Sequence, residues 1–243
     1  AAPLRRFLTR LKEKEPTKAA EGPPHSKTWR NFHSPSAKDS TFRNVPSLSQ
    51  IMRWFLIFSA ILIANVTANA QLAANNRFEK DVLAYEAADK TNPPPRNAIL
   101  LAGDSQFFRW KTVHEDLPGY TIINRGIDSF QTSDLIQYTG RLVLPYRPRL
   151  IVLHVGGNDV HSAKTPERVL PDFKVFVAKV RAVLPDVPIA SPSLTPGPAR
   201  WDEAAQRKET NRLIKEYIAT QPHLQFIDLW DAMLTSDGKP RED

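Results

Sequence analysis

Short apolar runs alternate with amphipathic stretches along the chain from about residue 71 to its end. The apolar runs are four to six residues long, which is too short for helices, and most of their side chains are hydrophobic, as expected of strands covered on both faces. They fall at residues 98–102, 120–124, 150–155, 187–190 and 224–229. We therefore predict five strands in one buried sheet.

Between these runs, apolar positions recur at helical spacing. Residues 78–90 predict a short amphipathic helix, which the prolines that follow it end. Thr165 and Pro166 begin a second helix as its cap and first residue. Pro171 is expected to kink this helix in its first turn, and residues 203–219 form a third helix. Strands that alternate with helices predict an α/β domain with a parallel, doubly wound sheet.

The positive charge of the chain is concentrated at its start. Residues 1–51 hold ten Lys and Arg against four Asp and Glu, which is +6 of the net +7 of the whole chain. The part that carries the regular pattern is therefore almost neutral, and we exclude nucleic-acid binding. The chain has no cysteine, so disulfides and thiolate metal sites are excluded as well.

Residues 52–70 have the pattern of a secretory signal peptide. A basic start at Met52 precedes the apolar run 54–63, and residues 68–70 (Ala-Asn-Ala) supply the small side chains of a cleavage site before Gln71. The alternative is a membrane anchor, but the apolar run is well short of the roughly 20 residues that span a bilayer. We expect export to the periplasm or the outside, with no stable membrane anchor after cleavage.

The segment before the signal is rich in Pro, Ser and Lys. Residues 1–51 show little apolar periodicity, so we expect a disordered basic leader. Since Met52 is a plausible start, the hypothesis is that this leader is translated upstream sequence.

Three short motifs each follow one of the first three predicted strands. They are Gly103-Asp104-Ser105, Asn124-Arg125-Gly126 and Gly156-Gly157-Asn158-Asp159. Because the carboxyl ends of parallel strands meet at one edge of the sheet, these motifs gather a hydroxyl, a backbone amide and a side-chain amide. Taken singly, each has a structural alternative: a helix cap, an ordinary turn, and a loop whose aspartate caps the next turn. Taken together and in this order, they predict a nucleophile with donors for an oxyanion.

With these motifs, the chain from about residue 78 to its end resembles the SGNH (GDSL-type) hydrolase superfamily, especially its platelet-activating-factor-acetylhydrolase-like bacterial members. The resemblance implies a flavodoxin-like three-layer α/β/α sandwich and no cofactor. It also implies that Ser105 is the nucleophile. The oxyanion donors would be the N–H groups of Ser105 and Gly126 and the side chain of Asn158.

Two features depart from the family pattern. Where many relatives carry further glycine, this chain has Ile127-Asp128-Ser129-Phe130. The family's Asp-x-x-His block, which supplies the catalytic base, has no counterpart, since Pro240 stands where the histidine would fall after Asp237. We expect that residues 71–243 form an incomplete domain without its final helix, and that the chain as it stands is nearly inactive.

The histidines offer no obvious replacement for this base. His161, after the third motif, is the weak candidate for a stand-in base, whereas His154 lies inside a predicted strand and reads as a packed or hydrogen-bonded core residue. The remaining histidines lie in predicted loops or in the leader: His114, His223, His25 and His33.

The expected function is that of a serine ester hydrolase acting on acyl or acetyl esters of carbohydrates or small lipids. Candidate substrate-binding residues are Asp104, Asp159 and Arg200, and no metal site is expected. Arg200 and Trp201 could equally be a surface pair with the indole packed on the scaffold. A second class stays open, a non-catalytic ligand- or carbohydrate-binding module on the same fold. A nucleotide-binding function is disfavoured because no G-x-G-x-x-G follows a strand.

Overall fold

The computed structural model describes Met52 and residues 77–241, and residues 80–241 belong to one compact unit. This unit is built on a parallel sheet of five strands in the order β2-β1-β3-β4-β5. The strands are β1 (Ile99–Gly103), β2 (Ile122–Gly126), β3 (Leu150–His154), β4 (Ile189–Pro192) and β5 (Leu224–Ile227). The order is that of flavodoxin-like doubly wound sheets, so the predicted fold class is confirmed.

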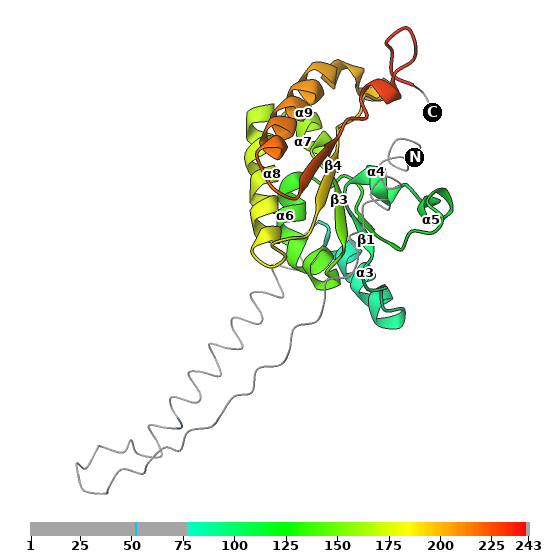
Figure 1. Cartoon of the computed structure of the whole chain (residues 1–243), viewed down its shortest axis with the longest axis vertical. Helices are drawn as coiled ribbons and strands as arrows, with labels where there is room; N and C mark the ends of the chain where they lie inside the picture. The colour runs from blue at the N-terminus through cyan, green and yellow to red at the C-terminus, as the bar shows by residue number, and fades with distance from the viewer. Residues whose placement is uncertain (1–51, 53–76, 242–243) are drawn as a thin grey trace, which may run out of the picture. The chain divides into compact units, whose positions relative to one another are not determined.

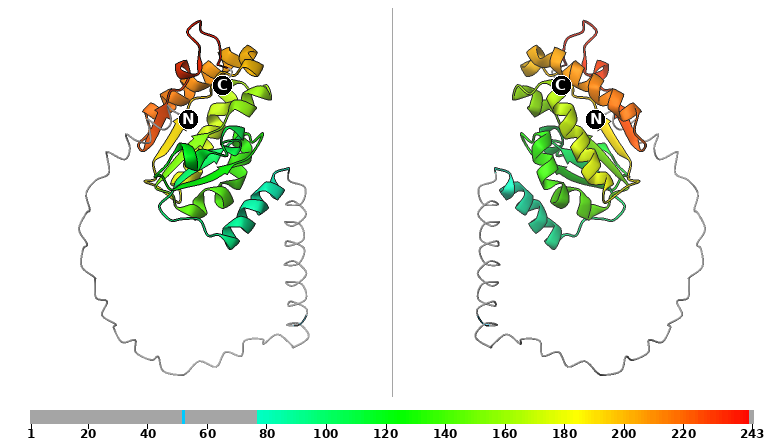
Figure 2. Two further views of the ribbon diagram at one scale, coloured as in Figure 1. Left: turned by 90° about the vertical axis from the view of Figure 1, so that its right-hand side faces the viewer. Right: turned by 90° about the vertical axis from the view of Figure 1, so that its left-hand side faces the viewer.

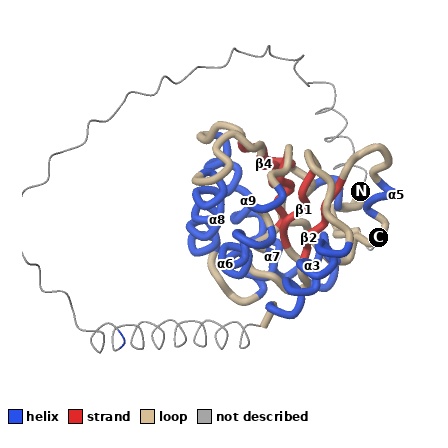
Figure 3. Tube along the Cα trace, turned by 90° about the horizontal axis from the view of Figure 1, so that it is seen from below, coloured by secondary structure: helices blue, strands red, loops and turns tan. Residues whose placement is uncertain are grey.

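Helices cover both faces of the sheet (Figures 1 and 3). One face carries α6 (Thr132–Leu142), α8 (Pro166–Arg181) and α9 (Ala204–Ala219), which pack side by side. The right-hand view of Figure 2 faces this layer. The other face carries the short helices α4 (Ser105–Phe108) and α5 (Val113–Asp116). The remaining elements are α3 (Glu79–Thr91), α7 (Gly157–His161) and the 3-10 turns η1 (Leu144–Tyr146), η2 (Pro198–Glu203) and η3 (Asp231–Met233).

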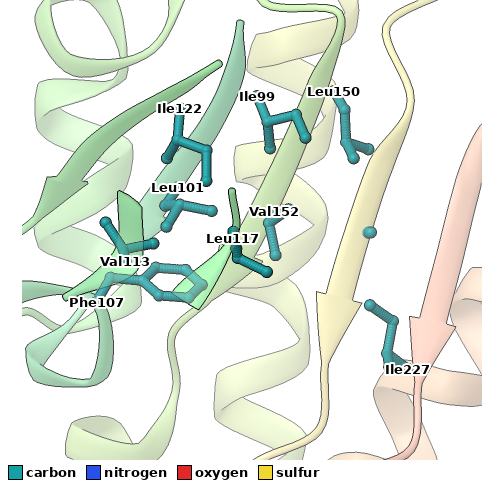
Figure 4. Packing of buried hydrophobic residues seen from close by; sticks show 10 residues of the cluster. Ile99, Leu101, Phe107, Val113, Leu117, Ile122, Leu150, Val152 and Ile227 are labelled. Atoms are coloured by element: carbon teal, nitrogen blue, oxygen red, sulfur yellow. The ribbon is translucent and has the colours of Figure 1, made fainter. Parts of the chain in front are cut away.

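The hydrophobic core on the α4 and α5 side joins all five strands. Alternate residues of β1 point to this side, as the period of two in a strand requires. Figure 4 shows Ile99 and Leu101 of β1 beside side chains from β2 and β3, with Phe107, Val113 and Leu117 close to Leu101 and Val152. All of these residues are buried. The core therefore fixes the turn from β1 to α4, on which the first motif lies.

The register of the central strands brings their carboxyl ends level. Gly103 is opposite Gly126 on one side and His154 on the other. A Cβ at Gly103 would come 1.8 Å from the carbonyl oxygen of His154, and the N–H of Asp104 donates to that same oxygen at 3.1 Å. Only glycine permits this approach, and it sets Ser105 directly beside the end of β3.

A polar cluster fastens α3 to the end of β2. The Arg125 guanidinium bonds to the Asp89 carboxylate and lies over the rings of Tyr85 and Tyr146, 4.8 and 4.6 Å from their centroids. The Tyr146 hydroxyl donates to Asp89 at 2.5 Å and accepts from Arg125 at 2.9 Å. Tyr85 donates to the carbonyl of Gly126 at 2.6 Å. Burial and the hydrogen bond to Asp89 raise the pKa of Tyr146 to about 12.

Element boundaries differ from the predictions for identifiable reasons. Both β2 and β4 begin two residues later than predicted, because their ladders start where the neighbouring strands offer partners. β5 ends at Ile227 because side chains take the next backbone groups: Ser193 Oγ accepts from the N–H of Leu229, and Asp228 accepts from the N–H of Trp230.

Pro171 does not interrupt α8, which runs unbroken past it. It lies on the exposed side of the helix, where water can solvate the carbonyl that the proline leaves free. Thr165 is the N-cap residue as predicted, but its side chain makes no capping bond.

The predictions of a leader, a signal peptide and a missing final helix concern the segments before α3 and after β5. The leader and the signal segment lie, apart from Met52, outside the described residues. In residues 77–241, no helix has the length and hydropathy needed to cross a bilayer. After β5, residues 228–241 contain the 3-10 turn η3 and an isolated bridge between Leu234 and Pro240.

Candidate active site

A cavity of about 250 Å³ opens at the carboxyl ends of the strands. Its walls come from the segments after β1, β2, β3 and β4, as the topology of the sheet predicts. The lining comprises residues 104–106, 128–129, 157–158 and 195–200, with Arg109, His154 and Arg207. The first and third predicted motifs thus meet in one place, and the second motif does not.

Ser105 is the first residue of α4 and lines the cavity. Within the described part of the chain, neither its hydroxyl nor its N–H has a hydrogen-bond partner, and only its carbonyl is engaged, by Arg109. The hydroxyl is therefore available to a ligand. Its place at the start of a helix also favours negative charge there.

Asp104 caps the turn into α4 and also lines the cavity. It is 3% exposed, and its Oδ1 accepts from the N–H of Gln106 at 3.0 Å, the N-cap bond of α4. His154, which also borders the cavity, places Nδ1 3.1 Å from the same oxygen. Asp104 therefore caps α4, as the structural alternative for this motif predicted. His154 is a buried, hydrogen-bonded residue, as its place in a predicted strand suggested.

The structure corrects the assignment of Gly126. This residue is not among those that line the cavity, and its N–H donates to the side chain of Asn124 at 2.9 Å. The glycine is needed because a Cβ there would lie 2.3 Å from the backbone nitrogen of Phe108. Gly126 therefore lets α4 pack onto β2 and has no free N–H for an oxyanion.

Ser129, in the loop after β2, borders the cavity where Gly126 does not. It lines the cavity from the loop after β2 and adopts the left-handed conformation with φ of +62°. Its hydroxyl donates to Asp128 at 3.1 Å, and its N–H has no partner in the described residues. A non-glycine residue with this φ is strained, so the loop, and not local preference, holds the backbone this way.

Asn158 faces the cavity as predicted. Its Nδ2 donates to the carbonyl of Phe130 at 3.0 Å, which orients the amide and leaves its second N–H free. Gly156 before it adopts a φ of +113°, a conformation that glycine supplies without strain. The bond to Phe130 also ties the loop after β3 to the loop after β2.

Asp159 does not reach the cavity, which corrects its prediction as a substrate-binding residue. The side chain is fully buried and accepts from the backbone and hydroxyl of Thr132 at 2.9 and 3.0 Å. Lys164 contacts its other oxygen at 2.7 Å. Burial alone would lower the pKa of Lys164, but the bond to Asp159 raises it above its ordinary value. Asp159 joins α7 to the start of α6.

His161 is also placed away from the cavity lining. Its Nδ1 lies 2.6 Å from Glu203 Oε1, so the structure gives it a structural partner in place of Ser105. Burial raises the pKa of Glu203, but hydrogen bonds from His161 and Arg207, with the charges of Arg207 and Arg200, bring it below its ordinary value.

Arg207 of α9 connects the two loops of the far wall. It is 8% exposed and donates to the carbonyls of Thr195 and Gly157, each at 3.3 Å. Nε and Nη2 both bond to Glu203, at 3.0 and 2.7 Å. Nearly all of its hydrogen-bonding capacity is used inside the protein.

Two further arginines border the cavity. Arg109 pairs with Asp128 at 2.9 Å in an exposed salt bridge. Arg200 lines the cavity as predicted and is half-buried. Trp201 is 40% exposed and does not line the cavity.

Sequence reasoning missed Ser129, Arg109 and Arg207. The sequence did contain a signal for Ser129, because residues 127–130 replace the further glycine of many relatives. No pattern in the sequence marks Arg109, which directly follows α4, or Arg207 on α9, because both reach the cavity only through the packing of those helices.

The flavodoxin-like sheet order and the cavity serine on the turn after β1 are those expected of a GDSL-type esterase. Among the described residues, no group of three or more His, Cys, Asp or Glu could hold a metal ion. The chain belongs to the GDSL-like lipase/acylhydrolase family, whose sequence model matches residues 93–243. The family predicted from the motifs is therefore confirmed, and its general chemistry is ester hydrolysis.

Solved structures share this fold. A candidate platelet activating factor from Streptococcus pneumonia superposes with a TM-score of 0.61 at 19% identity, covering 74% of this chain and 86% of the other. A candidate acylhydrolase from Bacteroides fragilis NCTC 9343 gives 0.55 at 18% identity, covering 70% and 89%. A GDSL-like lipase from Bacteroides thetaiotaomicron VPI-5482 gives 0.54 at 17% identity, covering 65% and 82%. The comparison with curated proteins found no match.

Proposed function

We propose that this protein hydrolyses esters through an acyl-enzyme on Ser105. The observation that carries the proposal is an unengaged hydroxyl at the start of α4, in the same cavity as two unengaged donors. These donors are the N–H of Ser129, in place of Gly126, and the free N–H of the Asn158 amide. The N–H of Ser105 itself is the third.

In the proposed reaction, Ser105 Oγ bonds to the acyl carbon while a base accepts its proton, and the alcohol leaves with a proton. Water then attacks the acyl-enzyme and releases the acid. The three N–H groups stabilise the tetrahedral oxyanion, where each donor is worth about 3–4 kcal/mol.

The test is covalent labelling with a fluorophosphonate, followed by peptide mapping of the modified serine. We expect the label on Ser105 and none after Ser105→Ala. Ser236→Ala, at an exposed serine outside the cavity, is the matched control and should label like the parent. Labelling spread over several serines, or unchanged by Ser105→Ala, would refute the nucleophile.

A second candidate function is a ligand-binding module on the same fold, whose polar cavity lining would hold a hydroxyl-rich ligand without reacting with it. In that case Ser105 only lines a binding cavity. Carbohydrate binding that Ser105→Ala leaves intact, together with no labelling by the fluorophosphonate, would favour the module over the hydrolase.

We also propose that the protein is exported. Support comes from the sequence alone: the basic start at Met52, the apolar run 54–63 and the small residues 68–70. Mass spectrometry of the secreted product should find Gln71 as its first residue. Peptides from residues 1–51 in that product would contradict cleavage before Gln71 and the view of the leader as upstream sequence, whereas a protein that stays inside the cell would contradict the export.

A further inference from the structure

The cavity lining contains little apolar surface. Among the described residues that form it there is no Leu, Ile, Val, Met, Phe, Tyr or Trp. The apolar carbon comes mainly from Pro196, Pro198 and Ala199. Long acyl chains are bound by apolar walls that remove them from water, so this lining favours a small acyl group and a hydroxyl-rich alcohol.

Three guanidinium groups line the same cavity, but only one is uncommitted. Arg109 is paired with Asp128, and Arg207 with Glu203 and two carbonyls. The side chain of Arg200 makes no hydrogen bond or ion pair with any described residue. Its charge lowers the pKa of Glu203, but that carboxylate already accepts bonds from His161 and Arg207.

A half-buried, unpaired guanidinium is best satisfied by a planar anion. Its donors form a fixed fork that matches the two oxygens of a carboxylate. The Ser105 end of the cavity is less suited to such an anion, because Asp104 and Asp128 line it there. Arg200 is therefore the part of the lining where a negative group of the substrate would be stabilised.

The topology indicates which part of the substrate carries that group. Ser105 follows β1 and Arg200 follows β4, and β3 lies between these strands. The carboxyl ends of β1 and β4 are two strand spacings apart, roughly 10 Å, and Arg200 lies beyond the end of β4, in η2. The anion therefore belongs to a part of the substrate several bonds away from the ester carbon.

Resting on the proposed function, we infer that the substrate is a short-chain ester of a hydroxyl-rich alcohol that carries a carboxylate, and that Arg200 binds this carboxylate. The chemistry is shared by acylated uronic acids and acylated hydroxy acids. Arg200 then decides which alcohol is accepted, while Ser105 performs the chemistry.

The experiment compares glucuronate with glucose, which differ in the carboxylate, by titration calorimetry on the full chain. We expect glucuronate to bind about 10- to 100-fold more tightly, the range for a charge-assisted hydrogen-bonded pair. Arg200→Gln should remove the preference, and Arg200→Lys should keep only part of it because it lacks the fork. Arg168→Gln, which removes the same charge at an exposed site on α8, is the matched control and should behave like the parent.

Equal affinity for the two sugars, or a preference that survives Arg200→Gln, would overturn the inference. The same preparations are labelled with the fluorophosphonate, so the two proposals are judged separately. A glucuronate preference that depends on Arg200 supports the inference even if Ser105 is not labelled, which would refute only the proposed nucleophile. Hydrolysis of acetylated glucuronate and acetylated glucose at equal kcat/KM would count against the inference and leave the esterase intact.

Discussion

At the scale of single residues, the site depends on which backbone groups are left without a partner. Gly126 and Ser129 are three positions apart in the sequence, and the backbone N–H of either could in principle serve as a donor. The N–H of Gly126 donates to Asn124, whereas Ser129 lines the cavity and its N–H has no partner among the described residues. We therefore propose Ser129, and not Gly126, as the donor from the loop after β2.

A first prediction concerns the strain at Ser129. Ser129→Gly should raise the free energy of unfolding by about 0.5–1 kcal/mol, because glycine adopts a positive φ without the steric cost of a Cβ. The N–H is kept, so labelling of Ser105 should persist. Urea denaturation measures the first effect. A loss of stability would mean that the bond from Ser129 to Asp128 outweighs the strain.

A second prediction concerns Asn158. Asn158→Ala should slow the labelling of Ser105 by about 10²–10³-fold, since it removes one oxyanion donor. Asn158→Asp retains the size of the side chain without its N–H groups and should be slowed as well. Time-resolved labelling measures both rates. An Asn158→Ala rate equal to that of the parent would exclude the side chain from the oxyanion site.

The residues that could be predicted from the sequence are those fixed by strand ends. Ser105 and Asn158 directly follow apolar runs, so the position of the run places them. Asp159 could not be placed, because one residue further along α7 the side chain turns from the cavity into the interface with α6. The direction of a loop side chain depends on packing that the local sequence does not encode.

At the scale of elements, the polar cluster between α3 and β2 gives the fold a dependence on alkaline pH. The pKa of Tyr146 is about 12 when folded against an ordinary 10.0. The folded state therefore holds this proton more tightly than the unfolded state. The resulting stability is fully present below pH 10 and is lost as the pH rises towards 12.

A third prediction follows for Tyr146→Phe. The parent should lose about 1 kcal/mol of unfolding free energy between pH 10 and 12 through this group, after allowance for solvent screening of a half-buried site. Tyr146→Phe should be less stable at pH 8, because Asp89 and Arg125 lose a partner, but should decline less steeply above pH 10. Urea denaturation at several pH values tests this. Parallel curves for the two proteins would contradict the assignment to Tyr146.

Elements were predictable from hydrophobic periodicity to within about two residues, as β2 and β4 illustrate. The exceptions have local causes. Pro171 is accommodated because it faces water, and β5 stops early because Ser193 and Asp228 satisfy the backbone beyond Ile227. The continuity of α8 and the end of β5 depend on neighbours in the folded structure and not on the hydrophobic periodicity of the sequence.

At the scale of the whole molecule, one hydrophobic cluster joins strands and helices that carry the site. Leu117 is fully buried in it, beneath residues from β1 and β3. The α/β order and the parallel sheet were predictable because consecutive apolar runs separated by helices admit few arrangements. The hydrophobic cluster on the α4 and α5 side could not be predicted, because its members are scattered over residues 99–227.

A fourth prediction tests this core. Leu117→Ala should lower the free energy of unfolding by about 2–5 kcal/mol, through lost burial and the cavity left behind. Leu83→Ala, at a leucine that is 52% exposed on α3, is the matched control and should change it by less than about 0.5 kcal/mol. Thermal and urea denaturation measure both. Equal effects of the two substitutions would show that the cluster does not stabilise the fold.

The position of Arg207 has a consequence for how ligands are received. Because one guanidinium holds the loops after β3 and β4 to α9, the far wall is assembled before a ligand arrives. Little conformational entropy then remains to be lost on binding, and ligands of the wrong shape cannot be accommodated by loop rearrangement. Association with this protein should therefore proceed in a single kinetic phase, and discrimination among esters should appear in their dissociation rates.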